Sequence, residues 1–280
     1  MGTTSGMLYL VATPIGNLED ISHRALKTLE NVDFIAAEDT RVSIKILNHF
    51  NIKKPLISYY EHNKAESGEK ILSRILSGEN CALVTDAGMP AISDPGEALV
   101  SLCATAGVPV TAIPGPCAAV TALALSGLPT GRFTFEGFLS TAKKSRFEHL
   151  NELKTEKRTM IFYEAPHKLR ATLADILSVL GDRRISISRE ITKLYEETLR
   201  FTVSEAIAHF EETPPRGEFV LIIEGTQTEE APEVSLGDAL NFVKKYRDAG
   251  LSLKDAVKQC ADETGFAKNT LYRAALEQNI

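Results

Sequence analysis

The segment from Asp86 to Gly96 constrains the fold of this chain more than any other stretch. It follows a short apolar run, Cys81–Val84, that is typical of a buried strand, and it precedes helical spacing over residues 97–103. It contains two glycines, two prolines and two aspartates. Glycine lets a ligand approach the backbone closely and proline restricts φ, so the loop has its shape before anything binds. In open α/β sheets, ligands bind at the carboxyl ends of strands, which is where this loop is expected to lie.

Two further loops of the same character follow other predicted strands. One runs from Ala12 to Asn17 after the first strand, and the other runs from Ile113 to Ala119 after the fifth. A single glycine- and proline-rich turn is usually only a turn. Because three such loops fall at strand ends, the sequence predicts a binding crevice at one edge of a sheet.

The first half of the chain alternates between short apolar runs and helical spacing. Strands are expected at 8–11, 32–36, 55–59, 81–85 and 108–113, and helices at 21–29, 42–50, 65–76, 97–106 and 118–125. Asp20 is positioned to cap the first helix. Five strand–helix units imply a mostly parallel sheet covered on both faces, which we assign to an N-terminal α/β domain over residues 7–128.

Beyond a cluster of turn-forming residues at 127–131 the alternation becomes looser. Strands are expected at 133–138, 159–163, 184–188, 198–203 and 219–224, and helices near 144–154, 167–180 and 204–212. Two strands with no helix between them, over 184–203, indicate an antiparallel pair. We therefore expect a second α/β domain with a mixed sheet over residues 129–226.

The C-terminal part is expected to be helical. The acidic, proline-containing stretch 226–233 is typical of a linker, and residues 234–280 contain three amphipathic segments. The second and third segments are separated by the short turn Thr264–Phe266, which contains glycine. This domain resembles a helix-turn-helix, but the pattern is not specific, because any small structural three-helix bundle has the same one.

Composition sets the broad class of protein. The 280 residues are 44% hydrophobic and 24% charged, as in ordinary globular proteins, and no apolar run approaches the roughly 18 residues that span a bilayer. Residues 1–6 are too short and polar for a signal peptide, and a flexible leader is expected there. The four cysteines, at 81, 103, 117 and 260, lie far apart without metal-binding spacing. A reduced, cytoplasmic protein without a structural metal is therefore expected.

The charge of the chain limits its partners. A net charge of −6 argues against a protein that coats nucleic acid without selectivity. Two local basic clusters remain. The first contains Lys143, Lys144, Arg146, Lys154, Lys157 and Arg158, and the second contains Lys244, Lys245 and Arg247. Each cluster fits either a local RNA contact or a solvated helix face.

Several common catalytic motifs are absent from the sequence. The chain lacks the P-loop pattern, the dinucleotide-binding G-x-G-x-x-G after a strand, H-E-x-x-H and G-x-S-x-G. P-loop hydrolysis, ordinary dinucleotide binding, zinc proteolysis and hydrolase-type acyl transfer are thus disfavoured. The crevice has no phosphate cradle, so a ligand that is neutral or cationic where it contacts the loops is expected.

Six motifs resemble one known family closely. They are Val11–Asp20, Ala37–Arg41, the loop 86–96, Ile113–Pro116, Phe162–Lys168 and Ser188–Lys193. Together they resemble the bacterial ribosomal RNA small subunit methyltransferase I family, from about residue 7 to the C-terminus. That family belongs to the tetrapyrrole-methylase superfamily, whose members bind S-adenosylmethionine in a cleft between two α/β domains. The resemblance implies this fold, a small C-terminal helical domain, and 2′-O-methylation of a cytidine in the decoding centre of 16S ribosomal RNA within the small ribosomal subunit.

The resemblance also implies a set of cofactor-binding residues. By correspondence with the superfamily these are Pro14, Asp86, Gly88, Met89, Ile92, Cys117, Ala118, Tyr163, Pro215 and Gly217. Pro14 is expected at the cleft floor, Tyr163 over the cofactor, and the backbone near Gly217 around the adenine. Cys117 stands where the family would have a small hydroxyl residue, which affects one local hydrogen bond. Core packing of Met89 and Ile92, and a turn-stabilising role of Asp86, remain alternatives.

A ribose hydroxyl is a poor nucleophile at neutral pH, and a general base accelerates such reactions by about 10²–10⁴-fold. The candidate bases are Glu38, Asp39, Glu164, His167 and Glu190. We expect a catalytic group of Glu190 or Asp39 as base, with Arg41 and Lys193 binding phosphates beside the target ribose. A structural ion pair, Asp39–Arg41 or Arg189–Glu190, is an equally good interpretation.

Two other functions fit the same residues. A small-molecule tetrapyrrole (precorrin-type) methylase would use the same cleft without needing the basic clusters or the helical tail. A non-enzymatic S-adenosylmethionine-sensing nucleic-acid-binding protein would depend on residues 235–280. For the favoured enzyme a homodimer is expected, because the basic surface of one protomer would then hold RNA beside the active site of the other.

Overall fold

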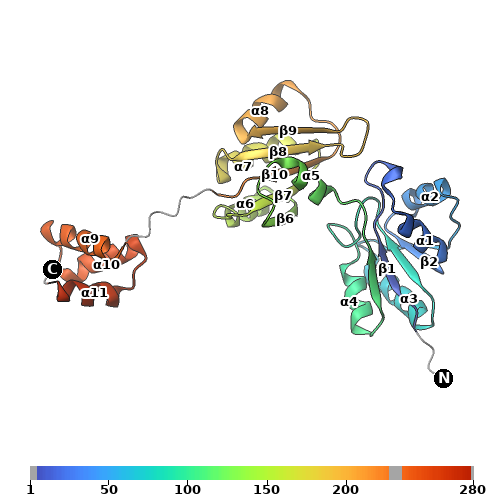
Figure 1. The fold of residues 1–280 in the computed structure, drawn as a ribbon, viewed down its shortest axis with the longest axis horizontal. Helices are drawn as coiled ribbons and strands as arrows, with labels where there is room; N and C mark the ends of the chain where they lie inside the picture. Colours follow the sequence, from blue (N-terminus) through green and yellow to red (C-terminus); the bar gives the residue numbers. More distant parts are fainter. Residues whose placement is uncertain (1–4, 227–234, 279–280) are drawn as a thin grey trace. The chain divides into compact units, whose positions relative to one another are not determined.

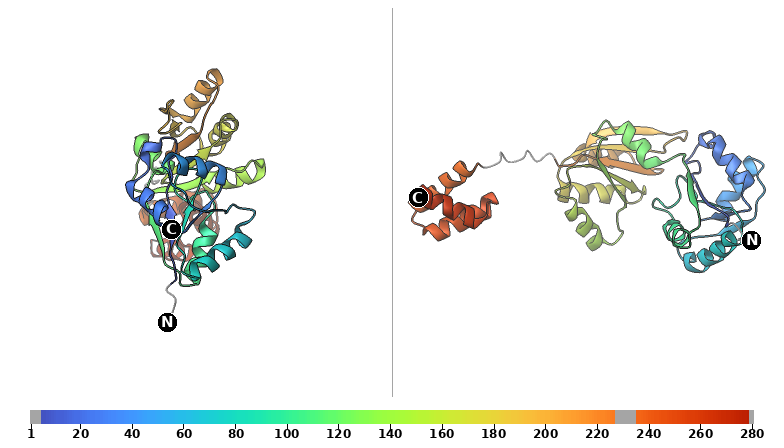
Figure 2. Two further views of the ribbon diagram at one scale, coloured as in Figure 1. Left: turned by 90° about the vertical axis from the view of Figure 1, so that its right-hand side faces the viewer. Right: turned by 60° about the horizontal axis from the view of Figure 1, so that its bottom comes forward.

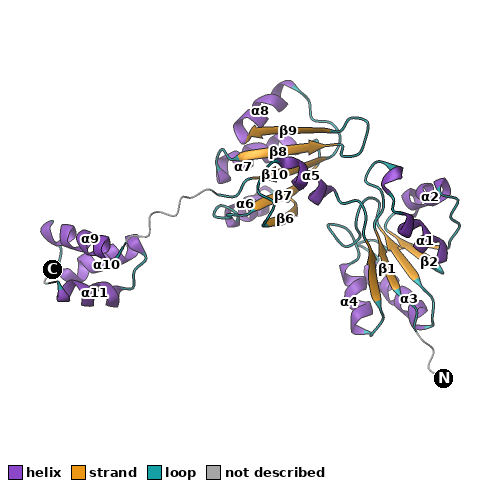
Figure 3. Ribbon diagram, in the orientation of Figure 1, coloured by secondary structure: helices purple, strands orange, loops and turns teal. Residues whose placement is uncertain are grey.

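The computed structural model describes residues 5–226 and 235–278. The chain divides into two compact units, Met1–Thr226 and Gln227–Ile280 (Figure 1). The first unit holds two five-stranded sheets and the second unit holds three helices, as the colouring by secondary structure shows (Figure 3). Among the described residues, no helix combines the length and apolar character needed to cross a membrane.

The first sheet has the strand order β3-β2-β4-β1-β5, and all of its pairs are parallel. Its strands are β1 (Leu8–Val11), β2 (Phe34–Ala37), β3 (Leu56–Ser58), β4 (Cys81–Val84) and β5 (Val110–Ile113). The predicted parallel sheet is thus confirmed. Because all five strands run the same way, the three glycine- and proline-rich loops leave the sheet at one edge.

Four helices cover both faces of this sheet: α1 (His23–Asn31), α2 (Thr40–His49), α3 (Lys64–Leu76) and α4 (Glu97–Thr105). α1 and α2 pack on one face through Leu29 and Leu47, and α3 and α4 pack on the other through Ile71 and Leu99. β4 is buried along its whole length because it has a neighbour on each side and a helical layer on each face.

Two sequence expectations in this region are wrong. The cap of α1 is Ser22, whose side chain accepts the backbone N–H of Ala25 at 3.1 Å, because Asp20 belongs to a preceding 3₁₀ turn, Leu18–Asp20. The leader expected over residues 1–6 is not flexible at Gly6, which is buried and donates its N–H to the carbonyl of Ile75 at 2.8 Å. Residues 1–4 lie outside the described part of the chain.

The second sheet has the order β6-β7-β10-β8-β9. Its strands are β6 (Phe133–Phe138), β7 (Thr159–Glu164), β8 (Arg184–Arg189), β9 (Glu197–Thr202) and β10 (Phe219–Ile223). β6 and β7 are parallel and the other pairs are antiparallel, so the mixed sheet and the β8–β9 hairpin are confirmed.

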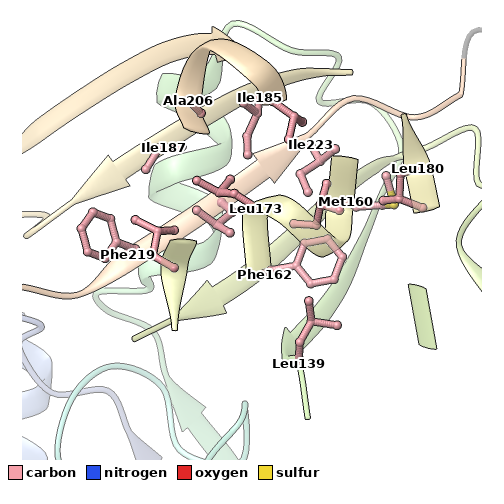
Figure 4. Close-up of a cluster of buried hydrophobic side chains, with 14 of the residues drawn as sticks. Leu139, Met160, Phe162, Leu173, Leu180, Ile185, Ile187, Ala206, Phe219 and Ile223 are labelled. Carbon is pink, nitrogen blue, oxygen red and sulfur yellow. The ribbon is translucent and has the colours of Figure 1, made fainter. Parts of the chain in front are cut away.

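Three helices cover one face of the second sheet: α6 (Lys143–Glu152), α7 (Leu169–Leu180) and α8 (Val203–Glu212). Figure 4 shows part of the shared core, including Phe162 of β7, Leu173 of α7 and Ala206 of α8. α8 begins with a capping box, in which the side chains of Thr202 and Glu205 satisfy each other's backbone N–H groups.

The opposite face of the second sheet is covered by α5 (Ala118–Ser126), which was expected to close the first domain. Ala122 and Leu123 of α5 pack with Ile161, Val220 and Ile222 of the second sheet. The reason is its composition: α5 has no polar face, so it requires an apolar surface to pack against, and the second sheet supplies one for Ala119, Ala122 and Leu123. The chain therefore passes to the second sheet before α5, not at 127–131, and this brings residues 117 and 118 to the junction of the two sheets.

The second unit contains α9 (Leu236–Asp248), α10 (Leu253–Thr264) and α11 (Lys268–Glu277), drawn in red in Figure 2. Val243, Val257, Cys260 and Leu271 form its buried core. Gly265 ends α10 with a φ of +75°, so the three expected helices and the glycine-containing turn between the last two are confirmed. Apart from Thr226, the linker expected at 226–233 lies outside the described residues.

The first basic cluster is only partly a surface feature. The Arg146 guanidinium bonds Asp175 of α7 at 2.6 Å and the carbonyls of Ser140 and Thr141, and the two side chains of the pair are 14% and 16% exposed. Arg146 therefore joins α6 to α7, whereas Lys143 and Lys144 remain on the surface.

Arg146→Ala is expected to destabilise the protein by about 2–3 kcal/mol, because it leaves the Asp175 carboxylate largely buried without its partner. The urea-unfolding midpoint, followed by circular dichroism, measures this. Lys144→Ala is the control: Lys144 is 89% exposed and lies 3.9 Å from Glu148, and its loss should cost less than about 0.5 kcal/mol. Equal midpoints for the two variants would contradict the structural role of Arg146.

Candidate active site

A cavity of about 520 Å³ lies where the two sheets of the first unit meet. Its volume is within the range of small-molecule sites. It is lined by residues 86–89, 92–94, 117–118, 163–166 and 218–220, together with Ile15, Glu38, Phe138 and Ile191. Both sheets therefore contribute to one site, at the edge where the loops after β1, β2 and β4 emerge.

Two backbone hydrogen bonds shape the loop side of the cavity. Thr13 N–H donates to Gly88 O at 2.9 Å, and Gly88 N–H donates to Thr13 O at 3.1 Å. Gly88 has a φ of +86°, which favours glycine at this position. The Thr13 hydroxyl also donates to the carbonyl of Thr85 at 3.1 Å. The loops after β1 and β4 are thus held together as one surface.

Three carboxylates, Glu38, Asp86 and Asp94, line the same side of the cavity. The buried hydroxyl of Thr85 donates to Glu38 at 2.6 Å, and the backbone N–H of Asp39 donates to Asp86 at 3.1 Å. None of the three carboxylates forms an ion pair within the described residues 5–226 and 235–278. This wall is therefore negatively charged where it faces the cavity.

Burial and the negative charge of this wall raise the pKa values of two of its carboxyl groups. Burial, and then the nearby Glu38 carboxylate, raise the pKa of Asp94 to about 6. Burial and Glu38 also raise the pKa of Asp86. Both shifts have the same physical origin, because desolvation and like charges disfavour the ionised form. A cation in the cavity would be stabilised by this wall.

The second sheet supplies an aromatic wall. Tyr163 packs against Phe135 and Phe138, with ring centroids 5.1 and 5.5 Å away. Its hydroxyl accepts the backbone N–H of Ala119 at 3.2 Å, and burial raises its pKa to about 12, so it stays neutral. Phe138 follows a β-bulge at Gly137 and is 54% exposed, with the Lys168 ammonium 5.9 Å from its ring. A planar ligand group could therefore stack on the exposed ring of Phe138, next to the Lys168 ammonium.

Seven of the ten expected cofactor residues line the cavity. They are Asp86, Gly88, Met89, Ile92, Cys117, Ala118 and Tyr163. Pro14 is buried and directly precedes the lining residue Ile15. Pro215 and Gly217 precede the lining segment 218–220, and Gly217 packs its Cα against the side chain of Glu190. Pro14, Pro215 and Gly217 are thus close in the chain to lining residues but do not themselves line the cavity.

The four expected catalytic residues form two ion pairs outside the lining set. Asp39 caps α2 and binds Arg41, whose side chain is 88% exposed. The side-chain hydrogen bond from Arg41 lowers the pKa of Asp39 to about 2. A carboxylate held in its ionised form this strongly accepts a proton weakly.

Glu190 and Lys193 form the second pair, with 2.9 Å between Lys193 Nζ and Glu190 Oε1. The alternative pair of Glu190 with Arg189 is wrong, because Arg189 binds Glu197 across the β8–β9 hairpin at 3.1 Å. Lys193 also binds Glu218 at 2.8 Å. Burial raises the pKa of Glu190, but the hydrogen bonds from Lys193 and from the Glu218 N–H outweigh it, and the pKa lies below its ordinary value. The pair braces the loop between β8 and β9, and Ile191 of that loop reaches the cavity.

Asp94, Phe138 and Glu218 are lining residues outside the expected site. Asp94 belongs to the loop 86–96 that was singled out in the sequence, so its position there was a usable signal. Phe138 ends a strand, but only the pairing of β6 with β7 places that end at the cavity. Among the residues that the structure describes, no group of three histidine, cysteine, aspartate or glutamate side chains is placed to hold a metal ion.

The fold has relatives among solved structures. The structure of cobalt precorrin-4 methyltransferase, a cobalamin biosynthetic enzyme, matches with a TM-score of 0.59 and 18% identity, over 78% of this chain and 94% of that one. Residues 7–207 match the Tetrapyrrole (Corrin/Porphyrin) Methylases. The two-sheet unit thus has the tetrapyrrole-methylase fold that the sequence led us to expect.

Sequence relatives narrow the family further. Proteins named ribosomal RNA small subunit methyltransferase I from Halalkalibacterium halodurans and Synechocystis are 50% and 47% identical, over 95% and 97% of this chain and 93% and 98% of theirs. Residues 248–279 match the RsmI C-terminal HTH domain. The chain therefore belongs to the ribosomal RNA small subunit methyltransferase I family of the tetrapyrrole methylases.

The acidic wall predicts an unusual pH dependence of stability. The folded pKa of Asp94, about 6, lies above the unfolded value of about 3.9, so folding disfavours its charged form. Wild type should lose stability relative to Asp94→Asn as the pH rises from about 4 through about 6. At pH 8 the variant should be more stable by roughly 1–2 kcal/mol, allowing for solvent screening of a partly exposed group.

Asp39→Asn is the control, because its effect on the stability of the protein should have the opposite sign. The folded pKa of Asp39 is about 2, so its contribution to stability is present above about pH 4 and is lost as the pH falls through about 2. This variant should be less stable than wild type at neutral pH. Urea titrations of wild type and Asp94→Asn between pH 4 and pH 8, and of wild type and Asp39→Asn between pH 2 and pH 8, measure the two effects. A destabilised Asp94→Asn at pH 8 would contradict the raised pKa.

Proposed function

We propose that this protein transfers a methyl group from S-adenosylmethionine to the 2′-hydroxyl of a cytidine in the decoding centre of 16S ribosomal RNA, acting on the small ribosomal subunit. The observation that carries this proposal is the 50% identity, over 95% of the chain, to a protein named ribosomal RNA small subunit methyltransferase I. The cavity, with loops from one sheet and aromatic residues from the other, supports an enzyme of this type.

The same comparison disfavours the two alternatives. A tetrapyrrole methylase is related to this chain at only 18% identity, which supports a common fold and not a common substrate. A non-enzymatic sensor would have no need of a cavity that receives groups from two sheets. The near full-length relatives are named as methyltransferases, which favours an enzyme.

The residues of the cavity fit S-adenosylmethionine. When bound, this molecule supplies a methyl group on a positively charged sulfonium. The wall of Glu38, Asp86 and Asp94 suits a ligand with positive charge, and the backbone of Gly88 leaves space for close approach. The seven lining residues would contact the cofactor directly, and Pro14, Pro215 and Gly217 would support them from behind.

The main task of this chain is positioning. Holding two reactants near attack distance is worth up to about 7–11 kcal/mol in rate. On one side of the cavity, the backbone hydrogen bonds between Thr13 and Gly88 fix the loops before substrate arrives. On the other side, the loop 190–196 is fixed by the Glu190–Lys193 ion pair and by the hydrogen bond from the Thr192 N–H to Glu196. Arg41 is exposed beside the site and is available for a phosphate of the RNA, as the sequence led us to expect.

The partners follow from the proposed substrate. Lys143 and Lys144 are surface cations that can contact RNA, and a homodimer would place such a surface next to the cavity of the other protomer. The four cysteines are free, which agrees with the expected cytoplasmic location of an enzyme that modifies ribosomes.

The proposal is tested with small subunits isolated from a strain that lacks this protein. Tritiated methyl from S-adenosylmethionine should enter 16S ribosomal RNA, and nucleoside analysis should recover it as 2′-O-methylcytidine. Label on a base, or transfer to a tetrapyrrole and none to RNA, would contradict the proposal. Cofactor binding without any transfer would favour the sensor.

Gly88→Ala should weaken binding of S-adenosylhomocysteine at least about tenfold in calorimetry, a loss of about 1.4 kcal/mol. The added methyl group lies 3.5 Å from Ile15, another lining residue, at a φ of +86°. Gly107→Ala is the matched control, because its φ is +72° and nothing lies within 4 Å of the new atom. Both variants carry similar backbone strain, so equal affinities would show that Gly88 lies outside the cofactor site.

A further inference from the structure

Two adjacent apolar side chains, Leu194 and Tyr195, project into solvent from the loop between β8 and β9. Leu194 is 88% exposed and Tyr195 is 70% exposed, the highest values for large hydrophobic side chains within residues 5–226 and 235–278. Neither side chain forms a hydrogen bond or a ring contact within the described part of the chain. Apolar surface in water is unfavourable, so this apolar pair is available for contact with a partner.

The loop that carries the apolar pair is held in one conformation by its own polar groups. Lys193 Nζ binds Glu190 at 2.9 Å and Glu218 at 2.8 Å, and the Thr192 N–H donates to Glu196 at 2.6 Å. Glu190 and Thr192 have φ values of +51° and +68°, which are unfavourable for residues with a side chain, above all for a β-branched threonine. Backbone strain of this kind persists only where the surroundings hold it, and it concentrates at functional sites. The apolar pair therefore stands on a rigid base.

This base adjoins the cavity. Ile191 of the same loop lines the cavity, and so does Glu218, which Lys193 binds. Tyr195 is four residues from Ile191, so their Cα atoms are at most about 14 Å apart. The loop also packs against the first sheet's side of the site, because a Cβ atom on Gly16 would lie 2.4 Å from Lys193 Cγ and 3.2 Å from the Ile191 carbonyl oxygen. The apolar pair is thus within reach of the part of a substrate that adjoins the group in the cavity.

The surroundings of the apolar pair suit a nucleic acid. Gly217 packs against the base of the loop, where a Cβ atom would lie 2.5 Å from Glu190 Cγ. The preceding residue, Arg216, is exposed and takes part in no ion pair within residues 5–226 and 235–278. A phosphate can bind this guanidinium while a base stacks on the tyrosine ring, which is how proteins commonly hold unpaired RNA.

The size of the apolar pair favours RNA over a second copy of this chain. A stable protein interface buries about 800 Å² on each partner, which is more than two side chains supply. A single base needs only one ring to stack on.

We infer that the apolar pair holds an unpaired base of the RNA substrate, with Tyr195 stacked on that base and Leu194 packed beside it. The base belongs to a nucleotide that neighbours the methylated one, because the pair lies outside the cavity lining but close to it along the chain. Tyr195 is thus a positioning residue, which fixes the target ribose at the cavity. This inference rests on the proposed function and extends it to the way in which the RNA is held.

Tyr195→Ala should raise the KM for small subunits by between about 5-fold and about 150-fold and leave kcat within about threefold of wild type, because a stacked base is bound equally in the ground state and the transition state. Tyr195→Phe keeps the ring, and its KM should stay within about twofold of wild type. Both variants should keep the wild-type affinity for S-adenosylhomocysteine and the wild-type urea midpoint, which separates this role from a structural one.

Phe133→Ala is the matched control for the loss of an exposed aromatic ring. Phe133 is 41% exposed and begins β6, whereas the cavity-lining Phe138 ends that strand, so Phe133 lies at the far end from the cavity. Its KM for small subunits should be that of wild type. An equal rise in KM for Phe133→Ala and Tyr195→Ala would contradict a specific contact at the loop.

A second readout identifies what the apolar pair touches. With p-benzoylphenylalanine in place of Tyr195, irradiation in the presence of small subunits and S-adenosylhomocysteine should crosslink the protein to 16S ribosomal RNA, and primer extension should stop close to the methylated cytidine. A crosslink to distant RNA, to a ribosomal protein or to a second copy of this chain would overturn the inference, as would a wild-type KM in Tyr195→Ala. Each of these results leaves the proposed function standing. If wild type transfers no methyl to ribose, the proposed function fails, and this inference fails with it.

Discussion

The site depends on the pair of backbone hydrogen bonds between Thr13 and Gly88. These bonds join the loops after β1 and β4, which are neighbours in the sheet, and they require the φ of +86° that Gly88 adopts. With the Thr13 hydroxyl bound to Thr85 O, the loops become one rigid surface. The positions of Asp86 and Asp94 follow from it, because both belong to the loop that the bridge anchors.

The carboxylates near this surface are of two kinds, those that face the cavity without a cation partner and those that form ion pairs outside it. Glu38 and Asp39 are adjacent in sequence, yet Glu38 lines the cavity with its oxygen on Thr85, while Asp39 caps α2 and binds Arg41. Successive side chains that leave a strand point to opposite sides, which explains the difference. Asp86 and Asp94 face the cavity without a cation partner and have raised pKa values, whereas Asp39 and Glu190 are paired with cations and have lowered pKa values.

The cavity exists only because a second sheet closes it. α5 continues directly from the third loop but packs on β10 and β8, so its first residues lie at the junction of the sheets. Its Ala119 N–H holds the Tyr163 hydroxyl and fixes the aromatic wall. A site built this way offers two different surfaces, the loops and the aromatic rings, which suits the proposed group transfer between a cofactor and an RNA nucleotide.

Local patterns in the sequence were enough to predict both sheets, nearly all the helices, and the loop 86–96, because periodicity, glycine and proline act over a few residues. The resemblance of six motifs added the family and seven lining residues. The sequence left open whether Asp39 and Glu190 are paired, and the tertiary structure decided this and also which sheet α5 covers. Asp94, Asp39 and Glu190 look alike in the sequence. Their chemistry differs because burial and the nearest cation depend on residues far away in the chain, and only the fold brings those residues into contact.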